Sequence, residues 1–443
     1  MKIAIIGTGI SGMAAAWLLH RDHEITVFEQ NGHVGGHSNT VMVEEEGLDP
    51  VPVDTGFIVY NEATYPNLVR LFEHLEVPTE ASDMSFAVSI DRGRLEYSGT
   101  NLAALFAQRR NLLRLSHYAM LRDIVRFYRE APALMAAGSS PSLSLGDYLA
   151  AGGYGRGFVY NHLLPMGAAI WSATMAEIMA FPAESFVRFF HNHGLLKIND
   201  RPQWRTVSGG SREYVRRLTA GFADRIHRNR AAVALQRDPA GVTVADGTGG
   251  CERFDQAIVA AHADQALDLL LDASAEERQV LGAFRYTENR AVLHGDPSLM
   301  PRRKRAWASW NYLSDGREKG NGVSVTYWMN RLQNIDRSQQ VFVSLNPLSE
   351  PSAELTHASF VYDHPVFDQA AVSMQAEIGG IQGRQRTWFC GAYCGFGFHE
   401  DGLSAGLAVA EALGGQRPWR CDDTSPAGRN AAPVAIGELA AAE

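Results

Sequence analysis

Cysteine is scarce in this chain of 443 residues, and its four positions are widely scattered: Cys251, Cys390, Cys394 and Cys421. This scarcity excludes a disulfide scaffold and favours a reducing, cytoplasmic location. Cys390 and Cys394 have C-x3-C spacing, which admits a redox pair, but two small packing residues are the favoured interpretation. No His and Cys cluster has zinc-like spacing. His191 and His193 would point to opposite faces of a predicted strand, so no metal site is expected.

Long hydrophobic runs are also absent. No apolar stretch approaches the roughly 20 residues that span a bilayer, and the N-terminus already reads as a core strand, so no signal peptide is expected. The net charge of −9 argues against nucleic acid as a partner. With 46% hydrophobic and 20% charged residues, the composition is that of a globular protein long enough for two domains.

The N-terminal segment, rich in apolar residues and glycine, forms a dinucleotide-binding pattern. Residues 2–6 are apolar and predict a strand buried on both faces of a parallel sheet. A glycine-rich turn, a helix over 13–21 and a second strand over 24–28 follow, and Glu29 closes the unit. This order of strand, turn, helix, strand and acid is the dinucleotide fingerprint in its full context.

Each residue of the fingerprint has an expected role. Gly7 makes the tight turn, Gly9 lets the backbone approach a pyrophosphate, and Gly12 lets helix and strand pack closely. The N–H groups of the helix N-terminus favour phosphate. Glu29 lies 17 residues beyond Gly12 and is placed to accept hydrogen bonds from a ribose. The predicted contacts with the dinucleotide in this unit are Gly7, Gly9, Ile10, Ser11, Gly12, Glu29 and Gln30.

A second glycine pair selects FAD over NAD. Residues 33–40 read His-Val-Gly-Gly-His-Ser-Asn-Thr, and residues 53–57 add another position where backbone can come close to a ligand. NAD domains need no such loops, whereas FAD must pass its ribityl chain and flavin over them. An ordinary glycine-rich turn is the alternative interpretation. The predicted FAD contacts are Gly35, Gly36, His37, Ser38, Thr55, Gly56 and Phe57.

A third glycine turn lies near the C-terminus, in residues 395–406, after the apolar run 387–390. We expect it to wall the isoalloxazine ring, with the last helix aimed at the N1–C2=O edge. Glu400 and Asp401 would cap that helix, and a plain capped helix is the alternative. The strands over 230–233 and 241–244 would edge the adenine. The predicted contacts from these segments are Val233, Gly391, His399, Glu400, Asp401, Gly402 and Leu403.

The chain therefore predicts an α/β fold in which a Rossmann-like FAD-binding domain is interleaved with a mixed α+β substrate domain. Within the latter, a helix is expected from Tyr60 to Leu75 with Thr64 as its N-cap, and further helices over 102–137 and 145–182. The predicted domains are residues 1–60, 206–285 and 385–415 for FAD, 61–205 and 286–384 for substrate, and a Pro/Ala-rich flexible tail over 416–443.

This layout resembles the flavin-containing amine oxidase and phytoene desaturase superfamily. Up to about Gly415 the chain is more closely similar to FAD-dependent oxidoreductases encoded beside bacterial cyclopropane-fatty-acid synthases, and to the N-terminal FAD module of plant cyclopropane synthases. In contrast to the plant fusions, we expect the flavoprotein module alone, without a methyltransferase domain. The stretches that carry the resemblance are residues 64–67, 82–86, 170–172, 201–204, 332–335, 345–347 and 398–402.

The resemblance implies a substrate among membrane acyl chains, because bacterial relatives are associated with methyl-branched and furan fatty acids. We predict desaturation of a methyl-branched or otherwise modified fatty acyl chain, free or in a phospholipid, with hydride transfer to flavin N5 and oxygen or a quinone as acceptor. A single fingerprint without a C-x4-C disulfide disfavours a pyridine-nucleotide disulfide reductase. An amine oxidase, or a non-catalytic FAD-binding partner of a cyclopropane or methyl fatty acid synthase, remains an alternative.

Three side chains are the predicted catalytic residues: His399 for proton transfer, with Tyr327 and Trp171 in the substrate pocket. A structural role for His399, hydrogen-bonding its turn, is the alternative. Other candidates for the lining of the pocket are Phe57, Tyr60, His191, Trp204, Trp328, Asn346 and Phe398.

Two basic clusters contrast with the negative net charge. Residues 102–130 interleave arginines with Leu, Phe and Tyr, and residues 300–307 form a basic run that ends in Trp307. Such clusters could dock on anionic lipid at the inner face of the membrane. A solvated helix face and an exposed loop are the alternative. The arginines of the first cluster are Arg109, Arg110, Arg114, Arg122, Arg126 and Arg129.

Overall fold

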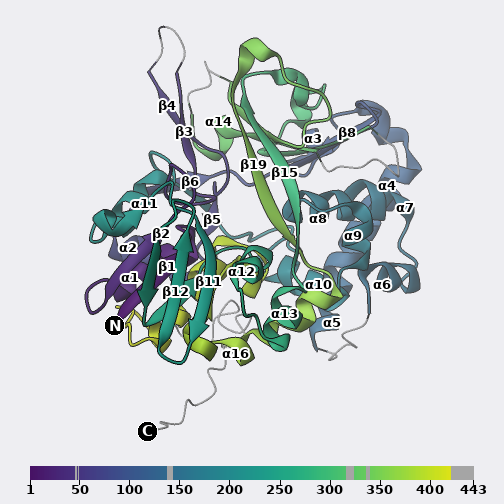
Figure 1. The fold of residues 1–443 in the computed structure, drawn as a ribbon. Coiled ribbons are helices and arrows are strands. Elements are labelled where there is room, and N and C mark those ends of the chain that lie inside the picture. Colours follow the sequence, from purple (N-terminus) through teal and green to yellow (C-terminus); the bar gives the residue numbers. More distant parts are fainter. Residues whose placement is uncertain (45–46, 48, 137–142, 316–323, 336–339, 421–443) are drawn as a thin grey trace.

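The computed structural model describes residues 1–44, 47, 49–136, 143–315, 324–335 and 340–420. Most of the predicted tail, and Cys421 with it, lies outside these residues. The two domains are built around two large sheets. Figure 1 shows β15 (Arg285–His294) and β19 (Thr356–Val366), two long strands of the second sheet, extending toward the helices of the first domain.

The first sheet is the parallel sheet that the N-terminal fingerprint predicts. Its strands are apolar and largely buried, because helices pack on one face while a small antiparallel sheet and further helices pack on the other. Helix α1 (Ile10–Leu19) packs closely against α17 (His399–Ala412), where a Cβ on Gly406 would lie 2.2 Å from the carbonyl oxygen of Ser11. The strand order is β10 (Ile226–His227), β2 (Glu24–Phe28), β1 (Lys2–Ile6), β14 (Gln256–Val259) and β20 (Thr387–Phe389).

A small antiparallel sheet flanks the nucleotide end. It consists of β11 (Ala232–Asp238), β12 (Gly241–Asp246) and β13 (Cys251–Phe254). The two strands predicted over 230–233 and 241–244 are therefore present and pair, but the first begins at Ala232 and residues 241–244 lie opposite 235–238. Further helices of this half of the molecule include α11 (Arg212–Thr219), α12 (Ala263–Leu269) and α13 (Ala275–Leu281).

The second domain combines a seven-stranded sheet with a group of helices. Every neighbouring pair in the sheet is antiparallel except β16 and β7, which run parallel. The strand order is β19, β15, β18 (Phe342–Leu345), β17 (Ser324–Trp328), β16 (Trp310–Ser314), β7 (Phe86–Ile90) and β8 (Leu95–Ser98). Its helices include α4 (Leu115–Glu130), α6 (Leu145–Ala151), α8 (Leu164–Trp171), α9 (Met175–Ala180) and α10 (Ala183–Asn192). The predicted architecture, a Rossmann-like α/β domain together with a mixed α+β domain, is therefore confirmed.

The helix predicted from residue 60 was wrong at its start. Residues Tyr60–Asn61 form strand β5, which pairs with β9 (Trp204–Val207), and helix α2 spans only Pro66–His74. Thr64 is not the N-cap, because the Asn61 side chain closes a turn onto the backbone N–H of Thr64 and donates to its hydroxyl, 2.8 Å away. Pro66 then disfavours helical backbone at the residue before it.

The strand predicted at His191 and His193 was also wrong. His191 lies in the last turn of helix α10, and His193 follows its end. The apolar side chains of this segment, Phe186, Phe189 and Phe190, recur with helical spacing and are all buried. Burial of that face against the neighbouring helices stabilises the helix. The two histidines therefore do not alternate between the faces of a strand.

The two cysteines Cys390 and Cys394 are free thiols. Cys390 is fully buried in the core around β1 and α1, and Cys394 packs against it. Burial raises the pKa of both thiols, that of Cys394 to about 12. These properties fit packing residues, since a reactive thiol needs a lowered pKa.

Candidate flavin and substrate cavity

A cavity of about 1020 Å³ extends from the carboxyl ends of β1 and β2 to strands β16 and β17 and helices α8 and α10. Ligands bind at the carboxyl ends of strands in parallel α/β sheets. Small-molecule sites usually occupy about 300–1,000 Å³, so this cavity suits a large cofactor together with a second molecule. Its lining divides into a polar, glycine-rich end and an apolar end.

The three glycines of the fingerprint differ in the space beside them. Gly7 has φ +101°, and a Cβ there would lie 2.6 Å from the carbonyl oxygen of Ala260. A Cβ on Gly12 would lie 2.0 Å from the oxygen of Gly7, whereas a Cβ on Gly9 would meet no protein atom within 4 Å. Gly7 and Gly12 thus permit the turn and the packing, and Gly9 leaves open space in the cavity for a phosphate.

The carboxylate of Glu29 lies at the ribose end. It accepts hydrogen bonds from the backbone N–H of Thr8 (3.0 Å), the hydroxyl of Thr8 (2.5 Å) and the backbone N–H of Asn31 (2.8 Å). A carboxylate offers about four acceptor positions, so Glu29 is held in place and retains capacity for a ribose hydroxyl. Sequence reasoning missed the clamp by Thr8, the variable position of the glycine motif.

Val233 is the predicted adenine contact. It lines the cavity, and the register of β11 against β12 is interrupted between Ala232 and Ala234, so Val233 has no partner in the ladder. A bulge leaves the backbone groups of one residue outside the strand pairing. These groups are suited to the edge of an adenine ring.

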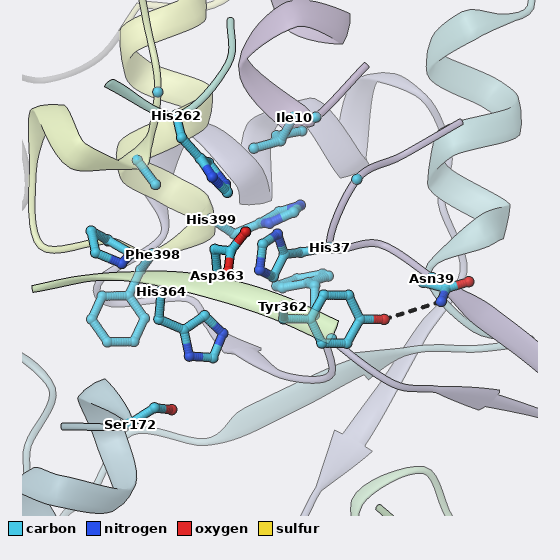
Figure 2. Close-up of a pocket in the computed structure, with 18 of the residues that line it drawn as sticks. Ile10, His37, Asn39, Ser172, His262, Tyr362, Asp363, His364, Phe398 and His399 are labelled. Carbon is cyan, nitrogen blue, oxygen red and sulfur yellow. Dashed lines mark hydrogen bonds between the residues drawn. The ribbon is translucent and has the colours of Figure 1, made fainter. Parts of the chain in front are cut away.

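His399 opens helix α17 at the flavin end and lines the cavity (Figure 2). Its ring stacks on Phe57 with a centroid distance of 3.9 Å, and its Nε2 atom lies 2.7 Å from the hydroxyl of Tyr214. Tyr214 also hydrogen-bonds Ser38. Burial lowers the pKa of His399 to about 3, so the imidazole is neutral near pH 7. The contacts hold the ring in one position and favour the structural interpretation over proton transfer.

Six of the predicted cofactor contacts do not line the cavity. The carboxylate of Glu400 instead accepts from the backbone N–H groups of Asn67 (2.9 Å) and Leu68 (3.0 Å), at the start of α2. Asp401 accepts from the backbone N–H of Phe398 (2.9 Å), so it caps its own helix. Burial raises the pKa of Glu400 to about 8 and that of Asp401 to about 7. The other four, all buried or packed against backbone, are Gly12, Ser38, Gly402 and Leu403.

A histidine cluster that the sequence did not suggest lies beside the second glycine loop. The ring of His37 is 5.6 Å from that of His364, 6.5 Å from that of His262 and 4.9 Å from that of Tyr362 (Figure 2). Burial lowers the pKa of His37 to about 3 and that of His364 to about 4. The alternation of Phe360, Tyr362 and His364 along β19 is the signal that could have revealed this wall.

The apolar end contains two of the predicted catalytic residues. The ring of Trp171 lies 4.7 Å from that of Phe189, and Tyr327 contacts Trp310 edge to face at 4.8 Å. Trp204 and Phe398 line the cavity as predicted, whereas Tyr60, His191, Trp328 and Asn346 do not. The apolar and aromatic lining consists of Phe86, Met166, Ile170, Trp171, Phe189, Leu195, Trp204, Trp310, Tyr327 and Phe398.

Arg201 is the single lysine or arginine among the residues that line the cavity in the described part of the chain. Its Nε–H donates to the carbonyl oxygen of Lys197 at 2.7 Å, and the residue is exposed. The guanidinium therefore lies where the apolar end meets solvent.

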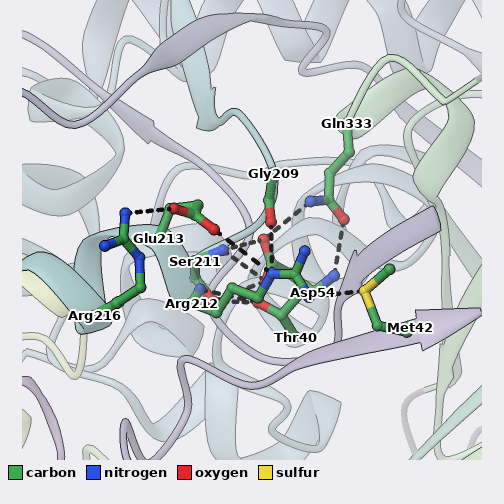
Figure 3. A network of polar contacts seen from close by, with 9 residues as sticks. All are labelled: Thr40, Met42, Asp54, Gly209, Ser211, Arg212, Glu213, Arg216 and Gln333. Carbon is green, nitrogen blue, oxygen red and sulfur yellow. Dashed lines mark hydrogen bonds and ion pairs between the residues drawn. The ribbon is translucent and has the colours of Figure 1, made fainter. Parts of the chain in front are cut away.

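The loop that carries Thr55, Gly56 and Phe57 is fixed by Asp54 (Figure 3). The buried carboxylate of Asp54 accepts from the backbone N–H of Ser211 (2.9 Å) and from the side-chain amide of Gln333 (3.0 Å). It also accepts from the hydroxyl of Thr40 at 2.6 Å. Burial raises the pKa of Asp54 to about 6. The network joins the FAD-binding loops to a segment of the second domain.

A parallel nucleotide-binding sheet joined to a second domain across this cavity defines a two-domain flavoprotein oxidoreductase. Residues 10–294 match the family described as flavin containing amine oxidoreductase, and the chain belongs to that family. The glycines, Glu29 and Val233 fit FAD, the cofactor of this class.

Solved structures show the same fold. The chain is similar to a conjugated linoleic acid (CLA)-producing fatty acid isomerase from P. acnes (TM-score 0.67, 15% identity, 93% of this chain and 98% of that chain). It is also similar to cyclohexylamine oxidase from Brevibacterium oxydans IH-35A (TM-score 0.66, 16% identity, 93% of this chain and 98% of that chain).

A curated relative matches a short segment. The 4,4'-diapophytoene desaturase of Staphylococcus aureus (strain Newman) is 52% identical over 53 residues, which is 12% of this chain. The match spans only 11% of that relative's length. In the described residues no helix is long and apolar enough to cross a membrane.

Proposed function

We propose that this protein is an FAD-dependent oxidoreductase that desaturates a methyl-branched or otherwise modified fatty acyl chain. The observation that carries the proposal is the apolar end of the cavity, where Trp171, Trp310 and Tyr327 accompany aliphatic side chains. An acyl chain buries apolar surface in such a site, with roughly 25 cal/mol gained per Å² removed from water. Aromatic faces also attract a cation, so the amine oxidase alternative is tested in the same experiment.

Bound FAD would accept the hydride that leaves a tertiary or allylic C–H bond, and a base or water would take the proton of the neighbouring carbon as the double bond forms; oxygen or a quinone would be the final acceptor. The residues that would hold it are the fingerprint turn, Glu29, the second glycine loop and Val233. His399 and Phe57 would support the ring end of the site. The aromatic wall would orient the C–H bond and exclude water, because such a bond offers little to acid catalysis.

The position of Arg201 supports an acyl substrate with an anionic head. A guanidinium pairs well with a carboxylate or a phosphate, and the apolar lining continues inward from it. The shared chemistry is an anion on a long apolar tail, either a free acid or a phospholipid. We also propose, on the resemblance described above, that a synthase that alkylates acyl double bonds supplies the modified chain and is a candidate partner.

Anaerobic reduction of the purified holoprotein tests the proposal. The flavin absorption band is followed while methyl-branched phospholipid, the branched free acid, unmodified phospholipid and simple amines are offered in parallel. Bleaching by a branched substrate with a new double bond in the product, two mass units lighter, is the expected result. Bleaching by amines alone would make the protein an amine oxidase. If none of these compounds bleaches the flavin and the protein forms a stable complex with a synthase, the protein would be a non-catalytic FAD-binding partner of that synthase.

A further inference from the structure

An exposed apolar surface lies on the outer side of the second domain. Large apolar side chains of the segment from α3 (Leu102–Leu105) through the short helix Arg109–Leu113 to α4 point into solvent. Leu113 is 90% exposed, Leu115 is 86% exposed and Leu102 is 77% exposed. Single exposed leucines are ordinary, but three so close in the chain, with Leu112 and Tyr118 also exposed, form a patch of the kind that marks an interaction site.

The same segment is strongly basic. Between residues 102 and 130 six arginines stand against Asp123 and Glu130, so the segment carries +6 − 2 = +4 in a chain of net charge −9. The side chain of Asp123 is 3% exposed and is paired with Arg122, so it adds little negative charge to the surface. Arg109 and Arg110 are exposed beside the leucines.

The fold adds the second basic cluster to this surface. The turn between β7 and β8 holds both clusters, because the carbonyl of Gly93 accepts from the side chains of Gln108 (2.8 Å) and Arg303 (3.4 Å). Glu96 pairs with Arg303 at 2.7 Å, and α3 contacts the short helix Lys304–Ala306. Arg302, Lys304 and Arg305 are exposed. Segments about 190 residues apart in sequence thus form one basic–apolar face, defined as the exposed residues of 102–118 and 302–305.

The chemistry of this face identifies its partner. Exposed leucines among arginines insert into the acyl boundary of a bilayer while the cations pair with headgroups. Each lysine or arginine near an anionic surface contributes about 1 kcal/mol. Leucines gain nothing from the phosphates of a nucleic acid, so a lipid surface fits both halves of the face. We propose that the basic–apolar face docks the protein onto a bilayer that contains anionic lipid. Docking involves no redox step and does not depend on the proposed reaction.

Co-sedimentation of the FAD-loaded protein with vesicles tests this proposal. Vesicles of phosphatidylcholine alone are compared with vesicles that include phosphatidylglycerol, at low and high salt. We expect binding to the anionic vesicles only, weakened by salt because the charges are exposed. Absence of binding to the anionic vesicles would overturn the proposal.

Two variants separate the apolar and basic contributions. Leu113→Ser with Leu115→Ser should weaken binding about tenfold or more, since both side chains leave the acyl boundary. Arg109→Gln with Lys304→Gln and Arg305→Gln should weaken it on the order of 100-fold. The matched controls are Leu271→Ser with Leu348→Ser, which are 66% and 53% exposed elsewhere, and the triple change Arg21→Gln, Arg228→Gln and Arg384→Gln at exposed positions.

The pattern of losses decides the matter. Equal effects in the control and face variants would overturn the assignment of the face. Loss in the charge variant alone, together with competition by DNA or an acidic protein, would mark a general polyanion site and would also overturn it. Flavin absorbance and melting temperature confirm that each variant is folded.

Discussion

The Nε2 atom of His399 lies 2.7 Å from the hydroxyl of Tyr214, although the two residues are 185 positions apart. One belongs to the last helix and the other to α11, and Ser38 of the second glycine loop completes the network. Three segments of the FAD-binding domain therefore meet at one buried polar contact beside the cavity.

Tyr214→Phe tests the weight of this contact. Loss of the hydroxyl leaves the buried His399 and Ser38 without their shared partner, and such a loss costs about 1–3 kcal/mol. We expect a lower free energy of unfolding in urea and faster release of FAD. Tyr160→Phe, at a half-buried tyrosine outside the network, is the control. Equal stability of Tyr214→Phe and wild type would mean that the contact contributes nothing.

Substitution of the fingerprint glycines should affect cofactor binding at one position and folding at another. Gly9→Ala places a methyl group in open space, so the apoprotein should keep its melting temperature while its affinity for FAD falls about tenfold, or about 1.4 kcal/mol. Gly12→Ala forces a Cβ to within 2.0 Å of the Gly7 oxygen, so that variant should lose its fold. Fluorescence titration with FAD and circular dichroism measure the two effects. Unchanged affinity for FAD in Gly9→Ala would contradict the prediction that a phosphate of FAD lies beside Gly9.

Buried histidines around the cavity predict sensitivity to acid. Burial lowers the pKa of His37 and His399 to about 3 and that of His193 and His364 to about 4. The stability that these neutral forms contribute is present above pH about 6.5, the unfolded value, and is lost as the pH falls toward the folded values. Each group should remove about 2 kcal/mol by pH 5.

Melting temperatures of the FAD-loaded protein between pH 7.5 and pH 5 measure this loss. His364→Gln should flatten the dependence by about one group's share, and His227→Gln, at an exposed position, is the control. A melting temperature that is constant over this range would contradict the prediction.

Arg201 distinguishes the two forms of the proposed substrate. Arg201→Gln should weaken binding of a branched free acid about tenfold, since charge-assisted pairs contribute about 1.5–3 kcal/mol, and should leave its methyl ester unaffected. Arg201→Lys should recover part of the affinity. If the acid is bound equally by wild type and Arg201→Gln while phospholipid binding falls, the anion recognised is the phosphate. Equal affinity of wild type and Arg201→Gln for every ligand would show that Arg201 does not contact the substrate.

The FAD-binding half was predictable from sequence because its signals are local. Gly7, Gly9 and Gly12 follow one strand within six residues, and each role follows from backbone sterics. Val233 was predictable in the same way, from two short strands joined by a turn. Prediction of side-chain roles was less successful where the partner is distant in sequence, because a local pattern does not say which way a side chain points. Glu400 could equally have faced the flavin, yet it caps a helix 333 residues earlier.

The substrate half illustrates the same limit. Tertiary packing decided that His193 follows a helix, and the side chain of Asn61 delayed the start of α2. Arg201 carried no motif, and its importance arises only because residues far apart in sequence line the same cavity. The aromatic residues Phe360, Tyr362 and His364 of β19 recur at every second position, but this pattern points to a binding wall only once the second glycine loop is known to lie beside it.

The bond from Glu400 to the start of α2 has a consequence for biosynthesis. The backbone groups of Asn67 and Leu68 obtain their partner only after about 330 further residues have been made, and β20 joins the parallel sheet just before the last helix. A ribosome-bound chain can therefore present the fingerprint turn long before the flavin pocket is closed. FAD capture should then be a late event that follows synthesis of α17, and truncation before α17 should yield a colourless protein.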